Sequence, residues 1–335
     1  MMESATRMKK TAGQWFAVLL CAIGLSSCHL GLARPTNKEP LRILETGIFT
    51  IALNHDGIAR EYLLYVPKGF NGRKPTAVVM MLHGGGGTGR AAMRETGWTE
   101  KADQAGFILI FPEASRRDQS EPANFRQNPQ LWNDGSMRFN TRVDDVGYIG
   151  SLIDDLKSRL PIDPQRIYAT GFSNGASMAY RLGQELPHRI AAIAPVAGAL
   201  WSQNLELERP VPLLYMTGSE DTLNPLEGGM PQLATGGQKL GGRAKPPVKD
   251  QIIRWAAALE CGSVPRTIYD RDGILGKVYP DCHGASTVVF YIISGAGHTW
   301  PGGNSILPER WVGKTTDKIK AIDIIWDFFK AHPLP

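Results

Sequence analysis

The sequence predicts an α/β fold with a mostly parallel central sheet and helices on both faces. Short apolar runs alternate along the chain with longer segments of helical periodicity, which is typical of a wound sheet. Two of these runs, at residues 77–82 and 107–111, are apolar throughout, as in strands that helices bury on both faces. The composition, with 42% hydrophobic and 21% charged residues, is that of an ordinary globular chain without internal repeats.

The elements can be placed in order along the chain. We expect strands at residues 47–53, 61–66, 77–82, 107–111, 166–170, 190–196, 211–217 and 288–293. We expect helices at residues 91–105, 143–160, 174–186, 250–259 and 316–331. Residues 54–57 read Asn-His-Asp-Gly, a sequence typical of a hairpin turn between the first two strands. Residues 115–141 and 226–248 are irregular, and long loops of this kind are either functional or plain surface insertions.

The N-terminus has the features of an export signal. Basic residues within the first ten positions precede an apolar run at residues 15–25, which suits a signal peptide and is too short to span a bilayer. The Leu-Ser-Ser-Cys that follows resembles a bacterial lipobox, in which cleavage precedes Cys28 and this cysteine is lipidated. A plain secretory signal is the alternative. We expect a lipoprotein signal peptide at 1–27, a tether at 28–44 and a single domain at 45–335.

Cysteine usage agrees with an exported protein. Cys21 would leave with the signal and Cys28 would carry lipid, so Cys261 and Cys282 remain as a pair in an oxidising compartment. We expect a disulfide between them; two free thiols or a metal site are the alternatives, and no Cys-x-x-Cys or His–Cys cluster favours a metal. The formal charge of +5 gives little indication of nucleic-acid binding.

A candidate nucleophile lies at Ser173. Residues 171–175 read Gly-Phe-Ser-Asn-Gly and connect an expected strand to an expected helix. A nucleophile elbow needs this context, because small flanking residues let the turn close tightly and place the serine hydroxyl above the sheet edge. The pattern by itself is common in a chain so rich in glycine, so the prediction depends on the context and on the partners of the serine.

A serine hydroxyl needs a base, and the histidines that follow it in the chain are His188, His283, His298 and His332. His298 follows the strand at residues 288–293 in a Gly-rich segment, so it is well placed to reach Ser173. His188 lies too close to the elbow's own helix, and His283 lies beside Cys282. His332 lies near the end of the chain, past the last expected helix. We therefore predict His298 as the base.

The acid is expected after a strand that lies between the serine and the histidine in the chain. The strand at residues 211–217 is followed by Gly-Ser-Glu-Asp, which makes Asp221 the predicted acid and Glu220 the alternative. Such an acid holds the histidine tautomer and stabilises the imidazolium. Asp144 and Asp145 precede the serine in a helix-like stretch, where we expect a structural role.

Backbone donors for a substrate oxyanion are also predicted. Residues 82–87 read Leu-His-Gly-Gly-Gly-Gly and follow an expected strand, as in the His-Gly-Gly-Gly motif of esterases. The N–H of Gly84 or Gly85, together with that of Asn174, would stabilise a tetrahedral oxyanion. A phosphate-binding loop is the alternative, but it requires a following Gly-Lys-Ser/Thr, and residues 87–90 read Gly-Thr-Gly-Arg instead.

Together these segments resemble the polyhydroxybutyrate depolymerase-type esterases, including bacterial feruloyl and acetylxylan esterases of the α/β-hydrolase fold. The resemblance runs from about residue 45 to the C-terminus. Its most specific part is Gly-His-Thr-Trp-Pro-Gly at residues 297–302. The other matching segments are residues 82–85, 132–133, 143–149, 171–178 and 218–221, with Trp255, Cys261 and residues 282–284. The resemblance implies the same triad that the chain order selects: Ser173, Asp221 and His298.

The predicted protein is a serine carboxylic-ester hydrolase that needs no metal or cofactor. We expect it to act on hydroxyalkanoate oligomers or on feruloyl or acetyl esters of polysaccharides, with Trp132 and Trp300 as candidate substrate contacts or, alternatively, core residues. An acyltransferase, a serine peptidase and a non-enzymatic carbohydrate-binding lipoprotein are the rival interpretations. We expect a periplasmic or outer-membrane lipoprotein, or an extracellular protein, that meets the membrane through its lipid anchor only; the sequence does not predict an oligomeric state.

Overall fold

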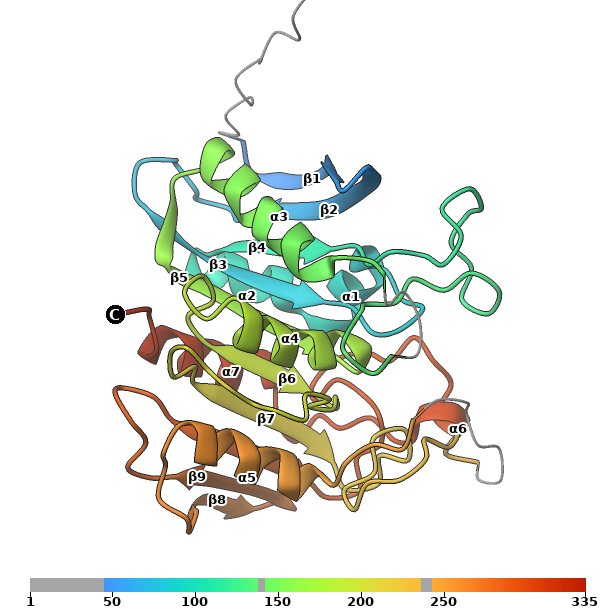
Figure 1. Ribbon diagram of the computed structural model, residues 1–335, viewed down its shortest axis with the longest axis vertical. Helices are drawn as coiled ribbons and strands as arrows, with labels where there is room; N and C mark the ends of the chain where they lie inside the picture. Colours follow the sequence, from blue (N-terminus) through green and yellow to red (C-terminus); the bar gives the residue numbers. More distant parts are fainter. Residues whose placement is uncertain (1–44, 138–141, 236–242) are drawn as a thin grey trace, which may run out of the picture. The chain divides into compact units, whose positions relative to one another are not determined.

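The computed structural model describes residues 45–137, 142–235 and 243–335 (Figure 1). The expected signal peptide, the tether and Cys28 lie outside the described residues. Within the described part of the chain, no helix has the length and apolar character that a membrane span requires.

A single sheet organises the described residues. Its spatial order is β1-β2-β4-β3-β5-β6-β7-β10-β9-β8, and neighbours from β4 to β10 in this order pair in parallel. The outer strands pair antiparallel. The strands are β1 (Gly47–His55), β2 (Ile58–Val66), β3 (Thr76–Leu82), β4 (Ile108–Pro112), β5 (Ile162–Phe172), β6 (Ile193–Val196), β7 (Leu213–Gly218), β8 (Arg266–Arg271), β9 (Ile274–Tyr279) and β10 (Val288–Ile293).

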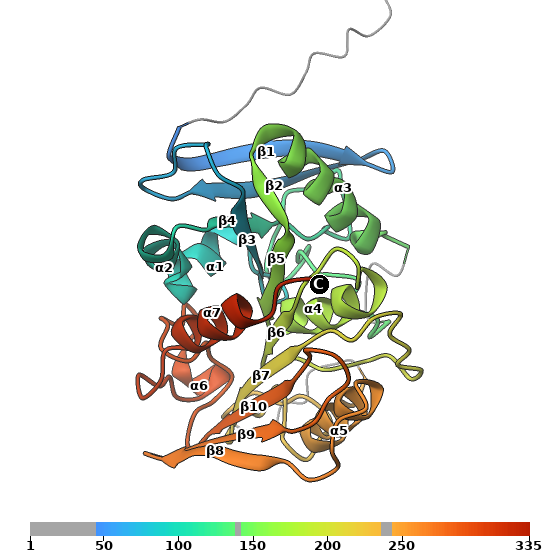
Figure 2. The ribbon, with the colours of Figure 1, turned by 90° about the vertical axis from the view of Figure 1, so that its left-hand side faces the viewer.

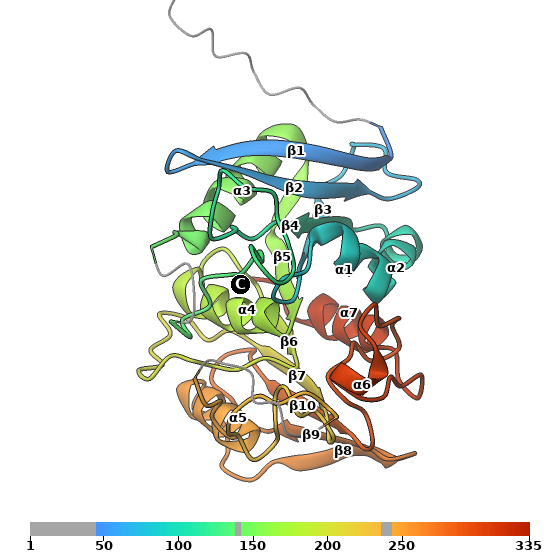
Figure 3. The same ribbon diagram turned by 90° about the vertical axis from the view of Figure 1, so that its right-hand side faces the viewer.

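Helices cover both faces of the sheet, which confirms the predicted fold class. One face packs against α3, α4 and α5, and the other against α1, α2 and α7, as Figures 2 and 3 show from opposite sides. Each face has its own cluster of buried apolar side chains, so the central strands are buried on both sides. The helices are α1 (Gly89–Thr96), α2 (Trp98–Ala105), α3 (Asp145–Arg159), α4 (Asn174–Glu185), α5 (Val248–Ala258), α6 (Glu309–Val312) and α7 (Ala321–Ala331).

The predicted elements are found, with shifted ends and one break. The helix expected at residues 91–105 is divided into α1 and α2 at Gly97, whose φ of 73° lies in the left-handed region that ends a helix. The last helix begins at Ala321, five residues later than the expected start at residue 316. The short helix α6 was not expected, and its four residues are too few for a periodic pattern.

The strands β8 and β9 were also missed. Strand β8 is mostly exposed and includes charged residues at both ends, so it lacks the apolar run that marks the inner strands. It pairs only with β9, at the edge of the sheet. Near this edge, Cys261 and Cys282 form a disulfide, which confirms the predicted bridge and fits an exported protein.

The parallel strands bring the loops that carry the predicted site residues to one edge of the sheet. Because β3, β5, β7 and β10 run in the same direction, the segments that follow them all leave at the same edge. In Figure 1 the arrows of β3 and β7 point to the right, where the long loops and α6 lie. The residues predicted to carry the chemistry all lie just beyond these strand ends.

Candidate active site

Ser173 occupies a strained turn between β5 and α4. Its φ of 56° and ψ of −116° are unusual for a residue with a side chain. The two glycines of the motif make this turn possible: a Cβ on Gly171 would lie 2.4 Å from the carbonyl oxygen of Gly175, and one on Gly175 would lie 2.2 Å from that of Leu82. The turn therefore packs directly against the end of β3, in the geometry of a nucleophile elbow.

A line of hydrogen bonds connects the three predicted triad residues. The Nε2 atom of His298 lies 2.8 Å from the Ser173 hydroxyl oxygen, and its Nδ1 atom lies 2.8 Å from Oδ2 of Asp221. An ionised carboxylate only accepts hydrogen bonds, so Nδ1 carries the ring proton and Nε2 is left to accept from the serine hydroxyl. The arrangement allows His298 to remove the Ser173 proton as the oxygen attacks an electrophile.

The carboxylate of Asp221 is held by the turn that follows β7. Its Oδ1 atom accepts hydrogen bonds from the backbone N–H groups of Leu223, at 2.9 Å, and Asn224, at 2.7 Å. The side chain is fully buried, and Oδ2 is directed at His298. Glu220, the alternative acid, is exposed, and its backbone N–H donates to the carbonyl of Ala296. Of the two acidic residues, the structure brings only Asp221 to the histidine.

The predicted oxyanion donors lie against the elbow. A Cβ on Gly85 would lie 3.5 Å from Cβ of Asn174, so the glycine-rich turn after β3 and the start of α4 are in contact. Among the described residues, neither the backbone N–H of Gly85 nor that of Asn174 donates to a protein acceptor. The carbonyl of Gly84 instead accepts hydrogen bonds from the N–H of Gly87 and the ring of His83. The N–H of Gly84 likewise donates to no protein acceptor among the described residues, so Gly84 and Gly85 both remain candidate donors beside Asn174.

His83 fixes the shape of the glycine-rich turn. Its Nε2 atom accepts a hydrogen bond from the N–H of Ala114 at 3.1 Å, so its Nδ1 carries the proton and donates to the carbonyl of Gly84 at 2.8 Å. Complete burial lowers the pKa of His83 to about 4, which keeps the ring neutral. A neutral ring that accepts on one side and donates on the other holds the turn beside Gly85 in place.

Glu113 lies next to His83, with its carboxylate 3.5 Å from the imidazole. Burial raises its pKa to about 7, although the N–H of Gly89 and the side chain of Gln130 donate hydrogen bonds to it. The carboxyl group therefore keeps its proton in the folded state at pH values where it would lose it in the unfolded chain. Its effect on the free energy of unfolding becomes less favourable as the pH rises from about 4.5 to 7.

Replacing Glu113 should change how the free energy of unfolding depends on pH. We expect Glu113→Gln to become more stable relative to the wild type as the pH is raised from 4.5 to 7, by roughly 3 kcal/mol over this range. The variant keeps His83, whose pKa is lower in the folded state than in the unfolded chain. Its effect on the free energy of unfolding therefore becomes more favourable as the pH rises from about 4 to 6.5, in the variant and the wild type alike. Urea unfolding at several pH values measures the free energy of unfolding of both proteins. A difference between them that does not change with pH would contradict the raised pKa of Glu113.

Trp132 supports the elbow from the loop that follows β4. It is almost fully buried, and its indole N–H donates to the carbonyl of His83 at 3.0 Å. Its backbone N–H donates to the side-chain oxygen of Asn174 at 2.8 Å. These contacts are those of a core residue that positions the turn, which was the alternative interpretation of Trp132.

Two acidic side chains, Asp134 and Asp145, hold the residues around the elbow, and of these Asp134 was not expected. The side-chain amide of Asn174 donates to Oδ2 of Asp134 at 2.7 Å. Asp145 accepts from the guanidinium of Arg60 and from the backbone N–H of Asn133, both at 2.7 Å, which gives it the expected structural role. No local sequence signal pairs Asp134 with position 174, since the two residues meet only after the sheet has formed.

Trp300 lies beside His298 in a confined space. It is 4% exposed, and it lines a cavity of about 30 Å³ together with His298, Gly84 and Phe172. The ring of Phe172 also packs against that of His298, with centroids 4.8 Å apart. A cavity of this size admits only a small group.

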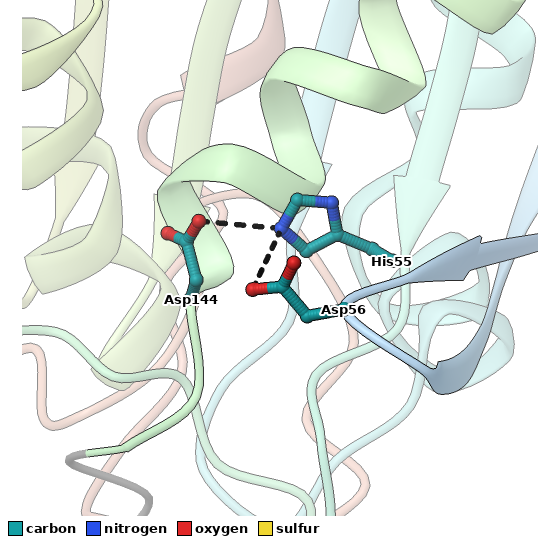
Figure 4. A group of neighbouring side chains, drawn as sticks. All are labelled: His55, Asp56 and Asp144. Atoms are coloured by element: carbon teal, nitrogen blue, oxygen red, sulfur yellow. Dashed lines mark hydrogen bonds and ion pairs between the residues drawn. The ribbon is translucent and has the colours of Figure 1, made fainter.

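One further group of side chains of the types that bind metals lies where the β1–β2 hairpin meets the start of α3. Figure 4 shows the carboxylates of Asp56 and Asp144 on the same side of the His55 ring, 3.8 Å and 3.2 Å from its Nε2 atom. Asp144 also caps α3 by accepting from the N–H of Gly147, and Ser151 contacts the other ring nitrogen of His55. These contacts attach the β1–β2 hairpin to the start of α3, so we assign the group a structural role.

The fold and this geometry define an α/β-hydrolase. Among solved structures, an acetyl xylan esterase from Aspergillus awamori has a similar fold, with a TM-score of 0.54 over 76% of this chain and 94% of that chain, at 16% identity. A family model described as phospholipase/carboxylesterase matches residues 70–230.

Comparison of sequences places the chain more narrowly. It is 31% identical over 296 residues to a putative esterase, NocK, from Nocardia uniformis subsp. tsuyamanensis, covering 81% of this chain and 79% of that protein. It is 28% identical to feruloyl esterase B from Piromyces equi, covering 82% of this chain but only 46% of that longer protein. It is 24% identical to poly(3-hydroxyalkanoate) depolymerase C from Paucimonas lemoignei, covering 71% of this chain and 58% of that protein.

The chain therefore belongs to the α/β-hydrolase family that contains feruloyl and acetylxylan esterases and polyhydroxyalkanoate depolymerases, and it is a carboxylic ester hydrolase.

Proposed function

We propose that the protein hydrolyses carboxylic esters through a covalent acyl-enzyme on Ser173. The observation that carries the proposal is the pair of 2.8 Å contacts that joins Ser173, His298 and Asp221 in one line. His298 takes the proton of the serine hydroxyl while its oxygen forms a bond to the ester carbonyl carbon. The histidine then returns the proton to the departing alcohol, and a water molecule releases the acid by the same steps in reverse order.

The N–H groups of Gly85 and Asn174 are the proposed oxyanion donors. Neither N–H has a protein acceptor within the described residues, and Gly85 lies against Asn174, the residue that follows the serine. Negative charge develops on the carbonyl oxygen only as the tetrahedral intermediate forms, so fixed donors at this place stabilise the transition state more than the ground state. Each such donor typically contributes about 3 kcal/mol.

The proposed substrates are hydroxyalkanoate oligomers or feruloyl or acetyl esters of polysaccharides. The support for this is the similarity to proteins with each of these names. Trp300 is the proposed substrate contact, because it lines the small cavity next to His298. Trp132 is proposed as a residue that positions the elbow instead.

We also propose that the protein is exported and anchored by lipid on Cys28, with residues 28–44 as a tether to a catalytic domain at 45–335. The disulfide between Cys261 and Cys282 supports export, because such bonds persist in oxidising compartments. Metabolic labelling with a palmitate analogue tests the anchor. Label on the wild type that is lost in Cys28→Ala supports it, and equal labelling of both contradicts it.

An ester panel tests the proposed reaction. Short p-nitrophenyl esters, methyl ferulate, acetylated xylan and hydroxybutyrate oligomers should include at least one good substrate. The matching p-nitroanilides should be much poorer, and comparable rates on them would favour a serine peptidase. An added acceptor alcohol should leave hydrolysis dominant in water, whereas dominant transfer to the alcohol would favour an acyltransferase.

A further inference from the structure

A half-exposed aromatic ring lies against the glycine-rich turn of the candidate active site. Phe125, in the segment that follows β4, is 51% exposed. Its ring takes the space that a side chain at position 86 would fill, since a Cβ on Gly86 would lie 2.7 Å from Cδ2 and 3.0 Å from Cε2 of the ring. Gly86 directly follows Gly85, one of the proposed oxyanion donors. An apolar ring is therefore fixed beside the place where the ester carbonyl would bind.

Hydrogen bonds hold the tip of the segment that carries Phe125, which projects beyond the strand ends on the right of Figure 1. Asn124 and Asn128 exchange backbone hydrogen bonds of 2.9 Å and 3.0 Å, which close a short loop that includes Phe125. The side chain of Asn128 is buried, and its amide donates to three backbone carbonyls of the same segment. Because the loop is already ordered, a contact with Phe125 would cost little conformational entropy.

The same segment also contacts the turn that supplies the oxyanion donors. The N–H of Gly86 donates to the carbonyl of Gln130 at 2.8 Å. A Cβ on Gly85 would lie 2.8 Å from the side chain of Leu131, so the end of the segment packs directly on that glycine. The segment therefore fixes the position of the Phe125 ring relative to the N–H of Gly85.

The order of the strands indicates which part of an ester would meet this ring. In the sheet, β3 and β4 lie on one side of β5, which leads into Ser173, and β10 lies on the other side, beyond β6 and β7. His298 belongs to the segment after β10, and in the proposed reaction it protonates the departing alcohol, so the alcohol part lies on that side. Phe125 belongs to the segment after β4, on the opposite side. The acyl part, which stays bonded to Ser173, therefore extends toward Phe125.

We propose that Phe125 contacts the acyl part of the substrate and selects esters whose acyl group carries an apolar extension of several atoms. This inference rests on the proposed reaction at Ser173. An acetyl group ends at the methyl carbon next to the carbonyl, so it is too short to cover a ring that lies one residue beyond Gly85. A longer alkyl chain or a phenyl group covers the exposed part of the ring, which removes apolar surface of both partners from water.

The test compares p-nitrophenyl esters that differ only in the acyl group, because these share one departing alcohol. The wild type should have a higher kcat/KM on the 3-phenylpropanoate than on the acetate. Phe125→Ala should lower kcat/KM on the 3-phenylpropanoate about tenfold, since covering half of an aromatic side chain contributes roughly this factor. Its kcat/KM on the acetate should stay within about twofold of the wild-type value.

Two further variants separate the contact from effects on folding. Phe125→Leu keeps an apolar side chain at this position, so it should lower kcat/KM on the 3-phenylpropanoate by less than about threefold. Ile268→Ala is the matched control, because Ile268 is exposed to the same degree, at 50%, and lies on β8 at the edge of the sheet. This variant should keep the wild-type kcat/KM on both esters.

The outcomes separate this inference from the proposed reaction. Equal losses of Phe125→Ala on both esters would mean that the ring only supports the glycine-rich turn, which would overturn the acyl contact and leave the ester hydrolase in place. No loss on either ester, or a wild type that prefers the acetate, would overturn the contact as well. A wild type that cleaves neither ester would overturn the reaction at Ser173 itself.

Discussion

Replacing Ser173 with alanine should reduce kcat for a p-nitrophenyl ester by about 10⁵-fold. The substitution removes the only atom that can form the acyl-enzyme, while the oxyanion donors and the substrate-binding surface remain. The residual rate should come from these groups alone, because a water molecule would have to attack without a covalent step. Initial rates with short p-nitrophenyl esters measure the loss.

The serine variant needs a control that separates chemistry from folding. Ser158 lies exposed on α3, where its hydroxyl donates to the carbonyl of Asp155 and to no other group in the described part of the chain. Ser158→Ala should therefore keep full activity. Ser173→Ala should keep the wild-type circular dichroism and unfolding midpoint, since alanine occupies no more space in the elbow. A Ser173→Ala variant that retains more than about 1% of the activity would contradict the nucleophile assignment.

Asp221→Asn should lower kcat by about 10⁴-fold, the second largest effect. Asparagine fits the same space, and its oxygen can still accept from the N–H groups of Leu223 and Asn224. Its amide would then present a donor to His298, which forces the proton onto the wrong ring nitrogen. With Nε2 protonated, the histidine can no longer accept the proton of Ser173.

The neighbouring acid provides the matched control for this variant. Glu220 precedes Asp221 directly but is exposed. Glu220→Gln removes one carboxylate charge from the same turn, so it should change kcat by less than about threefold, because an exposed charge is strongly screened. Similar losses in the two variants would indicate a general electrostatic effect of the turn and would contradict the specific pairing of Asp221 with His298.

The main features of the site were predictable because they depend on strand ends. Ser173 and His298 each follow an apolar run of sequence, and parallel strands deliver whatever follows them to one edge of the sheet. The order of the residues in the chain then limits the pairing. The glycines around Ser173 were informative for a similar reason, since a Cβ on either would overlap backbone atoms.

The choice between Glu220 and Asp221 was harder to make from sequence. The side chains of two adjacent residues point in different directions from the turn. Asp221 points inward because its carboxylate accepts from the backbone N–H groups of Leu223 and Asn224, and the sequence does not show this. Neither the hydrogen bond of Asp134 nor the 3.5 Å contact between Glu113 and the His83 ring was predictable. Their partners, Asn174 and His83, are distant in the chain, and neither residue carries a local pattern that would mark it.

The missed elements of the fold have their own physical causes. Strand β8 lies at the sheet edge with most of its side chains exposed, so it shows neither an apolar run nor a clear alternation. The break between α1 and α2 follows from the left-handed backbone of Gly97 and not from the helical periodicity, which continues across it. Edges and breaks are decided by single residues, whereas the buried strands are decided by whole segments.

Labelling with a fluorophosphonate probe tests the central claim most directly. The probe forms a covalent bond with a serine hydroxyl only where a base and oxyanion donors activate it. Intact-mass analysis of the wild type should show one equivalent of adduct, and peptide mapping should place it on Ser173. Ser173→Ala should remain unlabelled under the same conditions. An adduct on another serine, or equal labelling of the variant, would contradict the assignment of Ser173 as the nucleophile.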